Sequence, residues 1–318
     1  MMNKNIKIFD EKLRDAKSVV VLAHKNPDGD AMCSVLAMAR LIEKNYRAKC
    51  VCVYDGNAPD YLDNIPLRAR ATYWTKVGAA KPFDVAIILD YGAEHQVGGP
   101  LDFVKKSKFV VEIDHHKNDN PIADLCLDDD TADATGVLLY RIMHALKWRD
   151  DADVRDLLAI AILTDTGNFK FAHDGESLSV MADFVNSGVS INHLIELMNN
   201  KPRKAVLVEA AAVANAEFFY RNRLALATIS RRDYRNLDGR GEMLLNILGQ
   251  IKGVEYIVLL KEQKETQIGI SIRSRGAAID AIATAFGGGG HERAAGAVVR
   301  GDTLANVRAK IIEAFKGM

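Results

Sequence analysis

Residues 18–44 read SVVVLAHKNPDGDAMCSVLAMARLIEK, and they give the strongest indication of the fold class. Its first six residues form an apolar run rich in β-branched side chains, which predicts a strand over 18–23. The polar segment HKNPDGD at 24–30 contains one proline and one glycine, which are typical of a tight loop. The apolar spacing that follows predicts a helix over 31–44. The stretch is therefore a strand, a polar loop and a helix, the unit from which parallel sheets are built.

Similar apolar runs recur along the first half of the chain, separated by helical patterns. They are AKCVCVY (48–54), VAIILD (85–90) and FVVEID (109–114). Short β-rich runs that alternate with helices are typical of βαβ units, whose parallel sheet is covered on both faces. The predicted fold class is therefore α/β, with further helices expected over 136–146 and 154–163.

The second half of the chain predicts a smaller α/β domain. A helical stretch over about 177–219, broken at Gly188 and Pro202, is expected to connect the two parts. The strands expected beyond it are LALATIS (224–230), YIVLLKE (256–262) and QIGISIRS (267–274), and the expected helices cover 241–251, 279–285 and 304–315. We expect a catalytic domain over 1–185, a helical connector over 186–218 and a second domain over 219–318.

The composition is that of an ordinary folded protein without net charge. Of 318 residues, 48% are hydrophobic, and Lys+Arg and Asp+Glu both number 42. A neutral chain argues against a long duplex held by many phosphate contacts. The charges are unevenly placed, because residues 1–216 hold 26 basic and 31 acidic side chains whereas residues 217–318 hold 16 and 11. An acidic part suited to cations is thus followed by a basic part suited to phosphates.

The expected location is the cytoplasm. The apolar runs are shorter than the roughly 20 residues that a membrane span needs. The N-terminal segment is charged and helix-like, without the apolar core of a signal peptide. The cysteines form no CxxC pair and are expected to be structural; they are Cys33, Cys50, Cys52 and Cys126.

Four polar clusters in the first half each follow an apolar run. They are HKNPDGD (24–30), Asp90, DHH (114–116) and TDTG (164–167). Because ligands bind at the carboxyl ends of strands in open α/β sheets, we expect these side chains to meet at one edge of the sheet. Carboxylates gathered in this way repel one another, and bound cations relieve the repulsion. Since Asp90 ends an apolar strand, its carboxylate could bridge two ions.

The types of side chain limit the metal. Imidazoles and carboxylates without a thiolate favour manganese, with magnesium, iron, cobalt and zinc as lesser candidates. Taken alone, each cluster could also be purely structural, since Asp30 could cap a helix and Asp165 could cap a turn. The four clusters together favour a metal site. Further histidines lack carboxylate neighbours at ligand spacing and are expected to be structural or superficial; they are His95, His144, His173 and His193.

With these residues the chain resembles the DHH phosphoesterase superfamily, and most closely its NrnA-like subfamily of oligoribonucleases and 3′-phosphoadenosine-5′-phosphate (pAp) phosphatases. The four clusters carry the resemblance in the first half. In the second half, Arg273-Ser274, the GGGGH of 287–291 and the AAG of 294–296 match the C-terminal domain associated with DHH proteins. The resemblance implies a parallel-sheet catalytic domain, a smaller substrate-binding domain and an active-site cleft between them.

The resemblance also implies a role for each residue of the site. One manganese ion would be held by His24, Asp28 and Asp90. The second would be held by Asp30, Asp90, His115 and Asp165. The catalytic set would be Asp90, Asp114 and His116, with His116 facing the substrate phosphate and Asp114 supporting it. The far end of the substrate would be held by Arg273, Ser274, Gly288, Gly289, Gly290 and His291.

The implied activity is that of a phosphohydrolase dependent on two Mn²⁺ ions, with Mg²⁺, Co²⁺ or another divalent ion as alternatives. It would degrade oligoribonucleotides of a few nucleotides to mononucleotides and dephosphorylate pAp to AMP. Two alternatives stay open. One is the same chemistry on linear or cyclic dinucleotides such as pApA and cyclic di-AMP, and the other is a nucleotide- or RNA-binding sensor without catalysis. Neither a membrane nor a long duplex is expected as a partner, and a homodimer is left open.

Overall fold

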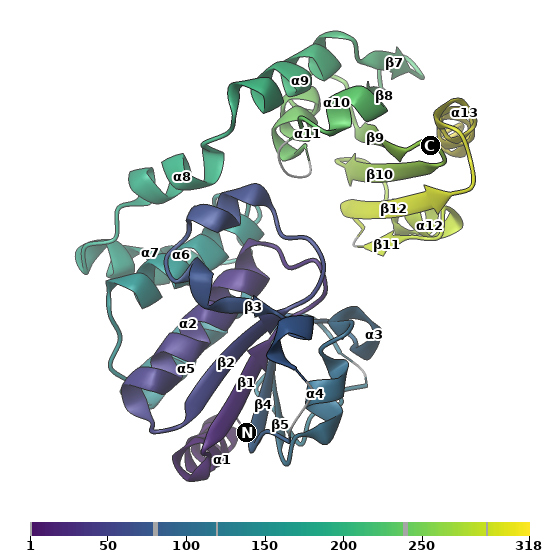
Figure 1. Cartoon of the computed structure of the whole chain (residues 1–318). Coiled ribbons are helices and arrows are strands. Elements are labelled where there is room, and N and C mark those ends of the chain that lie inside the picture. The colour runs from purple at the N-terminus through teal and green to yellow at the C-terminus, as the bar shows by residue number, and fades with distance from the viewer. Residues whose placement is uncertain (1, 79–81, 119, 238–240, 291) are drawn as a thin grey trace. The chain divides into compact units, whose positions relative to one another are not determined.

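The computed structural model describes residues 2–78, 82–118, 120–237, 241–290 and 292–318. Contacts between residues divide the chain into two units, residues 1–200 and 201–318, and each unit has its own sheet (Figure 1). The helices of the expected connector fall on both sides of this division. Among the described residues, no helix is both long and apolar enough to span a bilayer.

A six-stranded parallel sheet with the order β3-β2-β1-β4-β5-β6 forms the centre of the first unit. Its strands are β1 (Ser18–Leu22), β2 (Lys49–Tyr54), β3 (Ala71–Tyr73), β4 (Val85–Leu89), β5 (Val110–Ile113) and β6 (Leu125–Cys126). The chain runs outward from β1 to β3, returns to β4 beside β1, and then runs outward to β6 on the other side. The order therefore reverses between β1 and β4, which is where doubly wound sheets bind their ligands.

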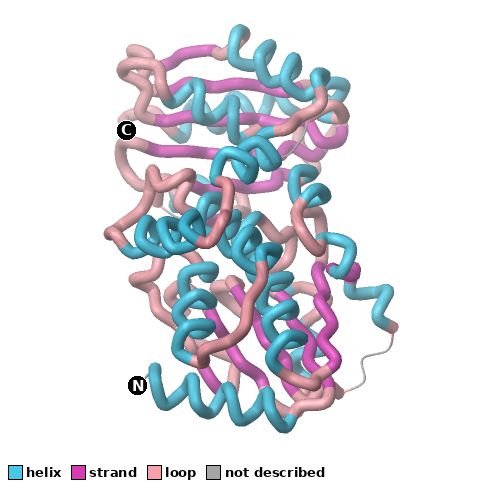
Figure 2. The backbone as a smooth tube through the Cα atoms, turned by 90° about the vertical axis from the view of Figure 1, so that its left-hand side faces the viewer, coloured by secondary structure: helices cyan, strands magenta, loops and turns pink. Residues whose placement is uncertain are grey.

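Helices cover both faces of this sheet, as the two views of the backbone show (Figures 1 and 2). They are α1 (Met2–Asp15), α2 (Gly29–Asn45), α3 (Glu94–Val97), α4 (Leu101–Lys106), α5 (Thr135–Ala145), α6 (Ala152–Asp165), α7 (Glu176–Asn186) and α8 (Ile191–Asn199), with short 3₁₀ turns η1 (Asp60–Asn64), η2 (Arg68–Arg70) and η3 (Trp74–Val77). Successive strand residues point to opposite faces. Val19 and Val21 therefore join the core with α2, α5 and α6, whereas Val20 and Leu22 join the core with α4. The predicted α/β class with a doubly covered parallel sheet is confirmed.

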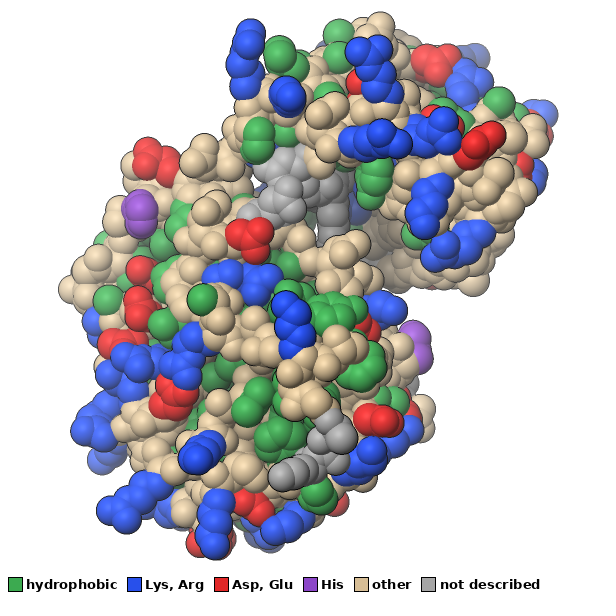
Figure 3. Space-filling view, in the orientation of Figure 1, with side chains coloured by type: hydrophobic (Ala, Val, Ile, Leu, Met, Phe, Trp, Pro, Cys, Tyr) green, Lys and Arg blue, Asp and Glu red, His purple; other side chains and the backbone are tan. Residues whose placement is uncertain are grey.

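A mixed six-stranded sheet with the order β11-β12-β10-β9-β8-β7 forms the second unit. Its elements are α9 (Arg203–Ala214), β7 (Glu217–Phe219), β8 (Leu224–Ile229), α10 (Arg231–Tyr234), α11 (Glu242–Gly249), β9 (Tyr256–Lys264), β10 (Gln267–Ser274), α12 (Asp280–Ala285), β11 (Gly289–Gly290), β12 (Ala294–Arg300) and α13 (Leu304–Ala314). One face packs against α12 and α13, and the other against α9 and α11. The predicted smaller α/β unit is confirmed, with β7, β11 and β12 as additional strands. Lys and Arg side chains are spread over the face of this unit seen in Figure 3, in line with its surplus of basic residues.

Candidate metal centre and active site

The reversal of strand order brings His24 and Asp90 to neighbouring carboxyl ends. β1 pairs with β4 in parallel, so the segments that follow both strands leave the same edge of the sheet. The His24 Nε2 atom lies 3.8 Å from Asp90 Oδ2 and 3.7 Å from Asp28 Oδ1. The Asp90 backbone has a φ of 49°, in the left-handed region that Asp tolerates better than most residues. Asp90 is buried, and its carboxylate faces this edge.

Asp114 fixes the turn after Asp90 and the ring of His116. Its Oδ2 atom accepts hydrogen bonds from Tyr91 N at 2.9 Å and Gly92 N at 2.7 Å. Its Oδ1 atom accepts from the backbone N of His116 at 2.9 Å and from His116 Nδ1 at 2.8 Å. With Nδ1 engaged by Asp114, Nε2 is the ring nitrogen of His116 that can address a substrate. The buried Asp114 thus joins the ends of β4 and β5.

The first loop ends earlier than the sequence predicts. The helix α2 begins at Gly29 rather than at Ala31, because Asp28 is its N-cap and accepts from Ala31 N at 3.2 Å. Asp30 therefore lies in the first turn of α2 rather than in the loop. The early start makes Asp28 serve both the helix and the metal-ligand cluster.

Asp165 does not follow a strand, contrary to the expectation that all four clusters would do so. It is the last residue of α6, which begins after the N-cap Asp151 and is buried against α2. The apolar run before Asp165 is long enough for a helix, and its side chains are buried on all sides. The end of α6 packs closely against the start of α2. A side chain at Gly29 would clash there, because its Cβ would lie 2.4 Å from Thr164 Oγ1, so glycine permits this close approach. This approach brings Asp165 beside the start of α2.

Asp30 is held by three donors that the sequence analysis did not identify. Ser34 Oγ donates to its Oδ1 at 2.9 Å, Thr135 N to its Oδ2 at 2.6 Å, and Gly136 N to its Oδ1 at 3.1 Å. The two backbone donors begin α5, so the positive end of a helix faces the carboxylate. Ser34 lies one turn along α2 and could have been found from spacing, whereas residues 135 and 136 are brought here only by the fold.

His115 supplies the clearest sign of a cation. Its Nδ1 lies 3.2 Å from the carbonyl oxygen of Ala132, which can only accept, so Nδ1 carries a proton. In the neutral ring, Nε2 then presents a lone pair. Among the described residues this buried Nε2 atom has no hydrogen-bond partner, although it lies 3.4 Å from Asp90 Oδ1 and 3.3 Å from Asp165 Oδ2. A lone pair facing two carboxylates is repulsive unless a cation or a proton lies between them.

Three groups of possible ligands overlap at this edge of the sheet. In each group the ligand atoms lie within 4.8 Å of one another. The groups are His24, Asp28 and Asp90; Asp30, His115 and Asp165; and Asp90, His115 and His116. All donors are imidazole nitrogens and carboxylate oxygens, a set that suits Mn²⁺, Mg²⁺, Zn²⁺ or another divalent ion. The residues present therefore fit divalent metal ions, and the structure brings together all six expected ligands.

Without cations the cluster holds protons instead. Burial, followed by the charges of Asp90 and Asp165, raises the pKa of Asp30 well above its usual value. Burial and the charge of Asp90 raise the pKa of Asp165 to about 7 against the opposing charge of His115. Burial alone would lower the pKa of His24 and His115, but the neighbouring aspartates raise the pKa of both rings to about 9.

Metal binding should therefore strengthen as pH rises from about 6.5 to 8.5. A cation needs the lone pairs of His24 and His115, so below their metal-free pKa of about 9 it must displace their protons. Each displaced proton changes the apparent affinity by about tenfold per pH unit. Calorimetry with Mn²⁺ in buffers of different ionisation enthalpy would measure both affinity and proton release. A variant of the surface residue His193, His193→Gln, should keep the same slope, and a pH-independent affinity would contradict the expectation.

The glycine motif of the second unit pairs with the AAG motif. Gly289–Gly290 form β11, which pairs with Gly296 and Ala295 of β12. A Cβ on Gly288 would lie 2.0 Å from the carbonyl oxygen of Gly296, whereas a Cβ on Gly289 would meet nothing within 4 Å. The first glycine is thus required by the close approach of two backbones, and the second leaves open surface.

The remaining expected substrate contacts lie near the end of β10. Arg273 pairs with Ala294 of β12 in the antiparallel register. Ser274 is buried, and its Oγ donates to the carbonyl oxygen of Ala277 at 2.6 Å and accepts from Gly276 N at 3.1 Å, so this hydroxyl holds a turn. His291 lies outside the described residues.

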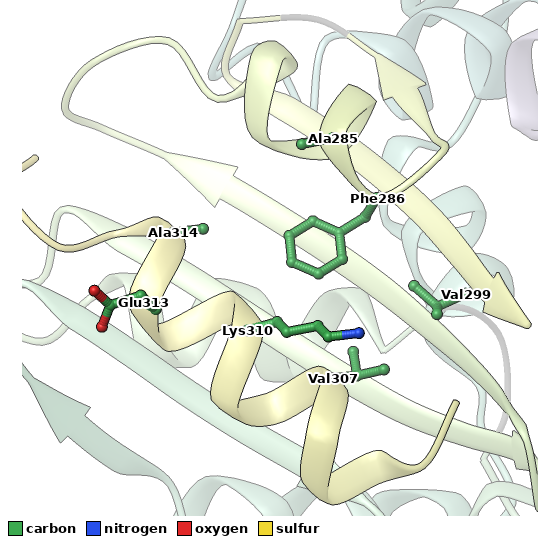
Figure 4. Close-up of a pocket in the computed structure, with 7 residues that line it drawn as sticks. All are labelled: Ala285, Phe286, Val299, Val307, Lys310, Glu313 and Ala314. Atoms are coloured by element: carbon green, nitrogen blue, oxygen red, sulfur yellow. The ribbon is translucent and has the colours of Figure 1, made fainter. Parts of the chain in front are cut away.

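A separate cavity of about 580 Å³ lies in the second unit, between α12 and α13. Figure 4 shows the ring of Phe286 and the side chain of Lys310 on its two sides. Its other lining residues are Ala285, Val299, Val307, Glu313 and Ala314. None of them belongs to the metal-ligand cluster or to the expected substrate contacts.

Comparison with known families identifies two domains. The model of the DHH family, N-terminal domain, matches residues 18–162, and the model of the DHHA1 domain matches residues 238–317. The first match covers the sheet with His24, Asp90 and His115, and the second covers the glycine motif.

Relatives and solved structures match nearly the whole chain. A protein of Thermus thermophilus named bifunctional oligoribonuclease and PAP phosphatase NrnA is 27% identical over 98% of this chain and 94% of its own length. The protein of the same name from Bacillus subtilis is 23% identical over 89% of each chain. The crystal structure of an exopolyphosphatase-related protein from Bacteroides fragilis has a TM-score of 0.88 at 21% identity, and covers 98% of this chain and 95% of that one. The similarity to the Bacteroides fragilis structure concerns the fold alone.

Proposed function

Because the chain belongs to the DHH family and is a metal-dependent phosphoesterase, we propose that it hydrolyses short oligoribonucleotides to mononucleotides and dephosphorylates pAp to AMP. The observation that carries the proposal is the buried His115 Nε2 atom, which faces Asp90 and Asp165 without a hydrogen-bond partner among the described residues. The names of the relatives from Thermus thermophilus and Bacillus subtilis support this substrate class. We propose Mn²⁺ as the metal, bound as two ions.

In this proposal the aspartates and histidines of the first unit hold the ions. Asp90 belongs both to the group with His24 and Asp28 and to the group with His115 and His116, and His115 in turn belongs to the group with Asp30 and Asp165. When bound, the ions would neutralise charge on the phosphate and supply a nucleophile by lowering the pKa of water. The ligand groups suit divalent ions because the ligand atoms of each group already lie within 4.8 Å of one another.

His116, held by Asp114, would act on the substrate phosphate through Nε2. The Asp114 carboxylate fixes the ring through Nδ1, and it raises the pKa of His116 to about 11 together with Asp90, against the lowering effect of burial. A protonated ring in this position can stabilise charge on the phosphate oxygens and donate a proton to the leaving oxygen. Its orientation depends on Asp114, which is why we assign both residues to the catalytic set.

The second unit would hold the end of the substrate away from the metals. We assign this role to Arg273, which can contact phosphate in a bidentate manner, to the surface at Gly289 and Gly290, and to His291. Ser274 would support the turn beside them. The proposed division of labour is a catalytic domain over 1–185, a connector over 186–218 and a substrate-binding domain over 219–318.

Product analysis on a panel of substrates tests the proposal. Chain treated with EDTA and then reloaded with Mn²⁺ should release mononucleotides from ApA and other short RNAs, and AMP and phosphate from pAp. In EDTA it should release no product from either substrate, and the His115→Ala variant should show no turnover in Mn²⁺. Preferred cleavage of pApA or cyclic di-AMP would favour the dinucleotide alternative. Tight nucleotide binding without product in Mn²⁺, Mg²⁺ or Co²⁺ would favour a sensor and contradict the enzyme.

A further inference from the structure

Phe171 exposes its ring in the turn that follows the proposed metal ligand Asp165. Among the described large hydrophobic residues its exposed fraction, 58%, is the highest. It lies in the turn that follows α6, six positions after Asp165. An exposed phenyl ring forgoes favourable burial, so such a ring on an ordered turn marks a binding surface when other features point the same way.

The turn that carries Phe171 is held tightly to the end of α6. Phe171 N donates to the carbonyl oxygen of Thr166 at 2.9 Å. The buried Thr166 donates through Oγ1 to Ile162 O at 2.6 Å and accepts from Phe169 N at 2.9 Å. The ring lies against Gly167, where a Cβ would be 2.9 Å from two of its atoms. Gly167 is two residues from Asp165, so their Cα atoms are at most about 7.6 Å apart.

A second anchor fixes the far end of the same turn. His173 donates from N and from Nδ1 to Asp133 Oδ1, at 2.9 and 2.8 Å, and Ser177 Oγ donates to Asp133 Oδ2 at 2.5 Å. Asp133 is buried, and it lies two residues before Thr135, whose N–H binds Asp30. The turn is therefore tied at one end to Asp165 and at the other to the segment that holds Asp30.

A cation lies over the exposed ring. The Nζ atom of Lys170 is 5.0 Å from the ring centroid of Phe171, and Lys170 is itself exposed. An aromatic face next to a flexible ammonium group, close to a site for phosphate, has the chemistry that recognises a nucleotide: the ring stacks on the base and the ammonium group attracts phosphate.

We propose that Phe171 is a stacking platform for the base of the nucleotide whose phosphate is at the metal-ligand cluster. This inference rests on the proposed function, since it takes the substrate to be a nucleotide. A phenyl ring has no hydrogen-bonding groups, so it accepts all four bases and discriminates against phosphates that have no base. Lys170 contacts the phosphate or ribose of the same nucleotide.

The test compares substrates that differ only in the stacked base. Wild type and Phe171→Ala are assayed on ApA and on the two dinucleotides in which one base or the other is replaced by hydrogen. We expect Phe171→Ala to lose about 10- to 100-fold in kcat/KM on ApA, mainly through KM, and to lose less than twofold on one of the two abasic dinucleotides. Phe171→Tyr should restore the rate on ApA. Equal losses on all three substrates, or no loss on ApA, would overturn the proposal.

Two controls distinguish loss of base stacking from a general loss of activity. Val185→Ala removes another exposed apolar side chain of the first unit, 42% exposed on α7, and should leave all three rates unchanged. If wild type releases no mononucleotide from ApA, the proposed function fails, and binding then tests the platform. Calorimetry with Mn²⁺ should show wild type binding AMP more tightly than ribose 5-phosphate, with the difference lost in Phe171→Ala. Equal AMP affinity in both proteins, as expected if the ring contacts a protein, would overturn the proposal.

Discussion

Asp90→Asn should lower kcat/KM by at least about 1000-fold while the protein stays folded. Asp90 is the only residue that belongs both to the group with His24 and Asp28 and to a group with His115 among the described residues. If two ions bind as proposed, loss of this charge weakens both ion sites, and with them the stabilisation of charge in the transition state. Asn tolerates the left-handed backbone at this position, where φ is 49°, so the effect should come from the lost charge.

The matched control for this variant lies at the other end of the same strand. Asp84 directly precedes β4, as Asp90 directly follows it, and its carboxylate binds Lys17 N, Ser18 N and the Lys108 ammonium at 2.9, 3.1 and 2.7 Å. Asp84→Asn should lower stability slightly and leave kcat/KM within about twofold, because this surface ion pair contributes little. Steady-state kinetics and metal analysis would decide. The assignment of Asp90 as a shared metal ligand would be contradicted if Asp90→Asn kept a tenth of the wild-type activity or still bound two ions tightly.

Gly288→Ala should destabilise the second unit by about 2 kcal/mol or more, whereas Gly289→Ala should not. At position 288 a Cβ would lie 2.0 Å from Gly296 O and 2.6 Å from Ala297 Cα, so β11 and β12 must separate. At position 289 the Cβ would meet nothing within 4 Å. Thermal unfolding monitored by circular dichroism should show a lower midpoint only for Gly288→Ala.

Kinetics on the same pair of variants would separate structure from binding. If the surface at Gly289 receives substrate, Gly289→Ala should raise KM with an unchanged unfolding midpoint. If both variants unfold at the wild-type temperature, the close approach at Gly288 is not a structural requirement. A KM for Gly289→Ala equal to that of wild type would remove Gly289 from the substrate-binding surface.

The sequence was sufficient for the four central strands of the parallel sheet and for the strand ends that bear His24, Asp90 and Asp114, whereas the short edge strands β3 and β6 were not predicted. Apolar runs that are buried on both faces are visible without a structure, and the carboxyl ends of parallel strands lie at one edge. Sequence patterns also placed three strands of the second unit. β7, β11 and β12 were missed: residues 217–219 fell within the expected helical stretch, β11 is a two-residue glycine strand, and β12 begins with alanine and glycine and has valines only near its end.

Contacts between segments that are distant along the chain could not be predicted from the sequence. Two expectations conflicted for the apolar run before Asp165, a helix over 154–163 and a strand end at the fourth cluster. The helix is confirmed as α6, which packs against α2, and the strand end was wrong. The Asp133 carboxylate meets His173 across 40 residues, so the expectation that this histidine lacks a carboxylate neighbour was wrong. The backbone donors at Thr135 and Gly136 carry no side-chain signature and depend entirely on where α5 begins.

The three donors on Asp30 have a consequence for how the protein acquires its ions. Ser34, Thr135 and Gly136 orient the carboxylate through donors that belong to the protein itself, and the start of α2 packs tightly against the end of α6. A receptor assembled in advance loses little conformational freedom on loading, so ions can enter and leave without melting the surrounding helices. Chelation followed by resupply should thus return an active enzyme without a refolding step, and the ion carried in the cell would follow from supply as much as from selectivity.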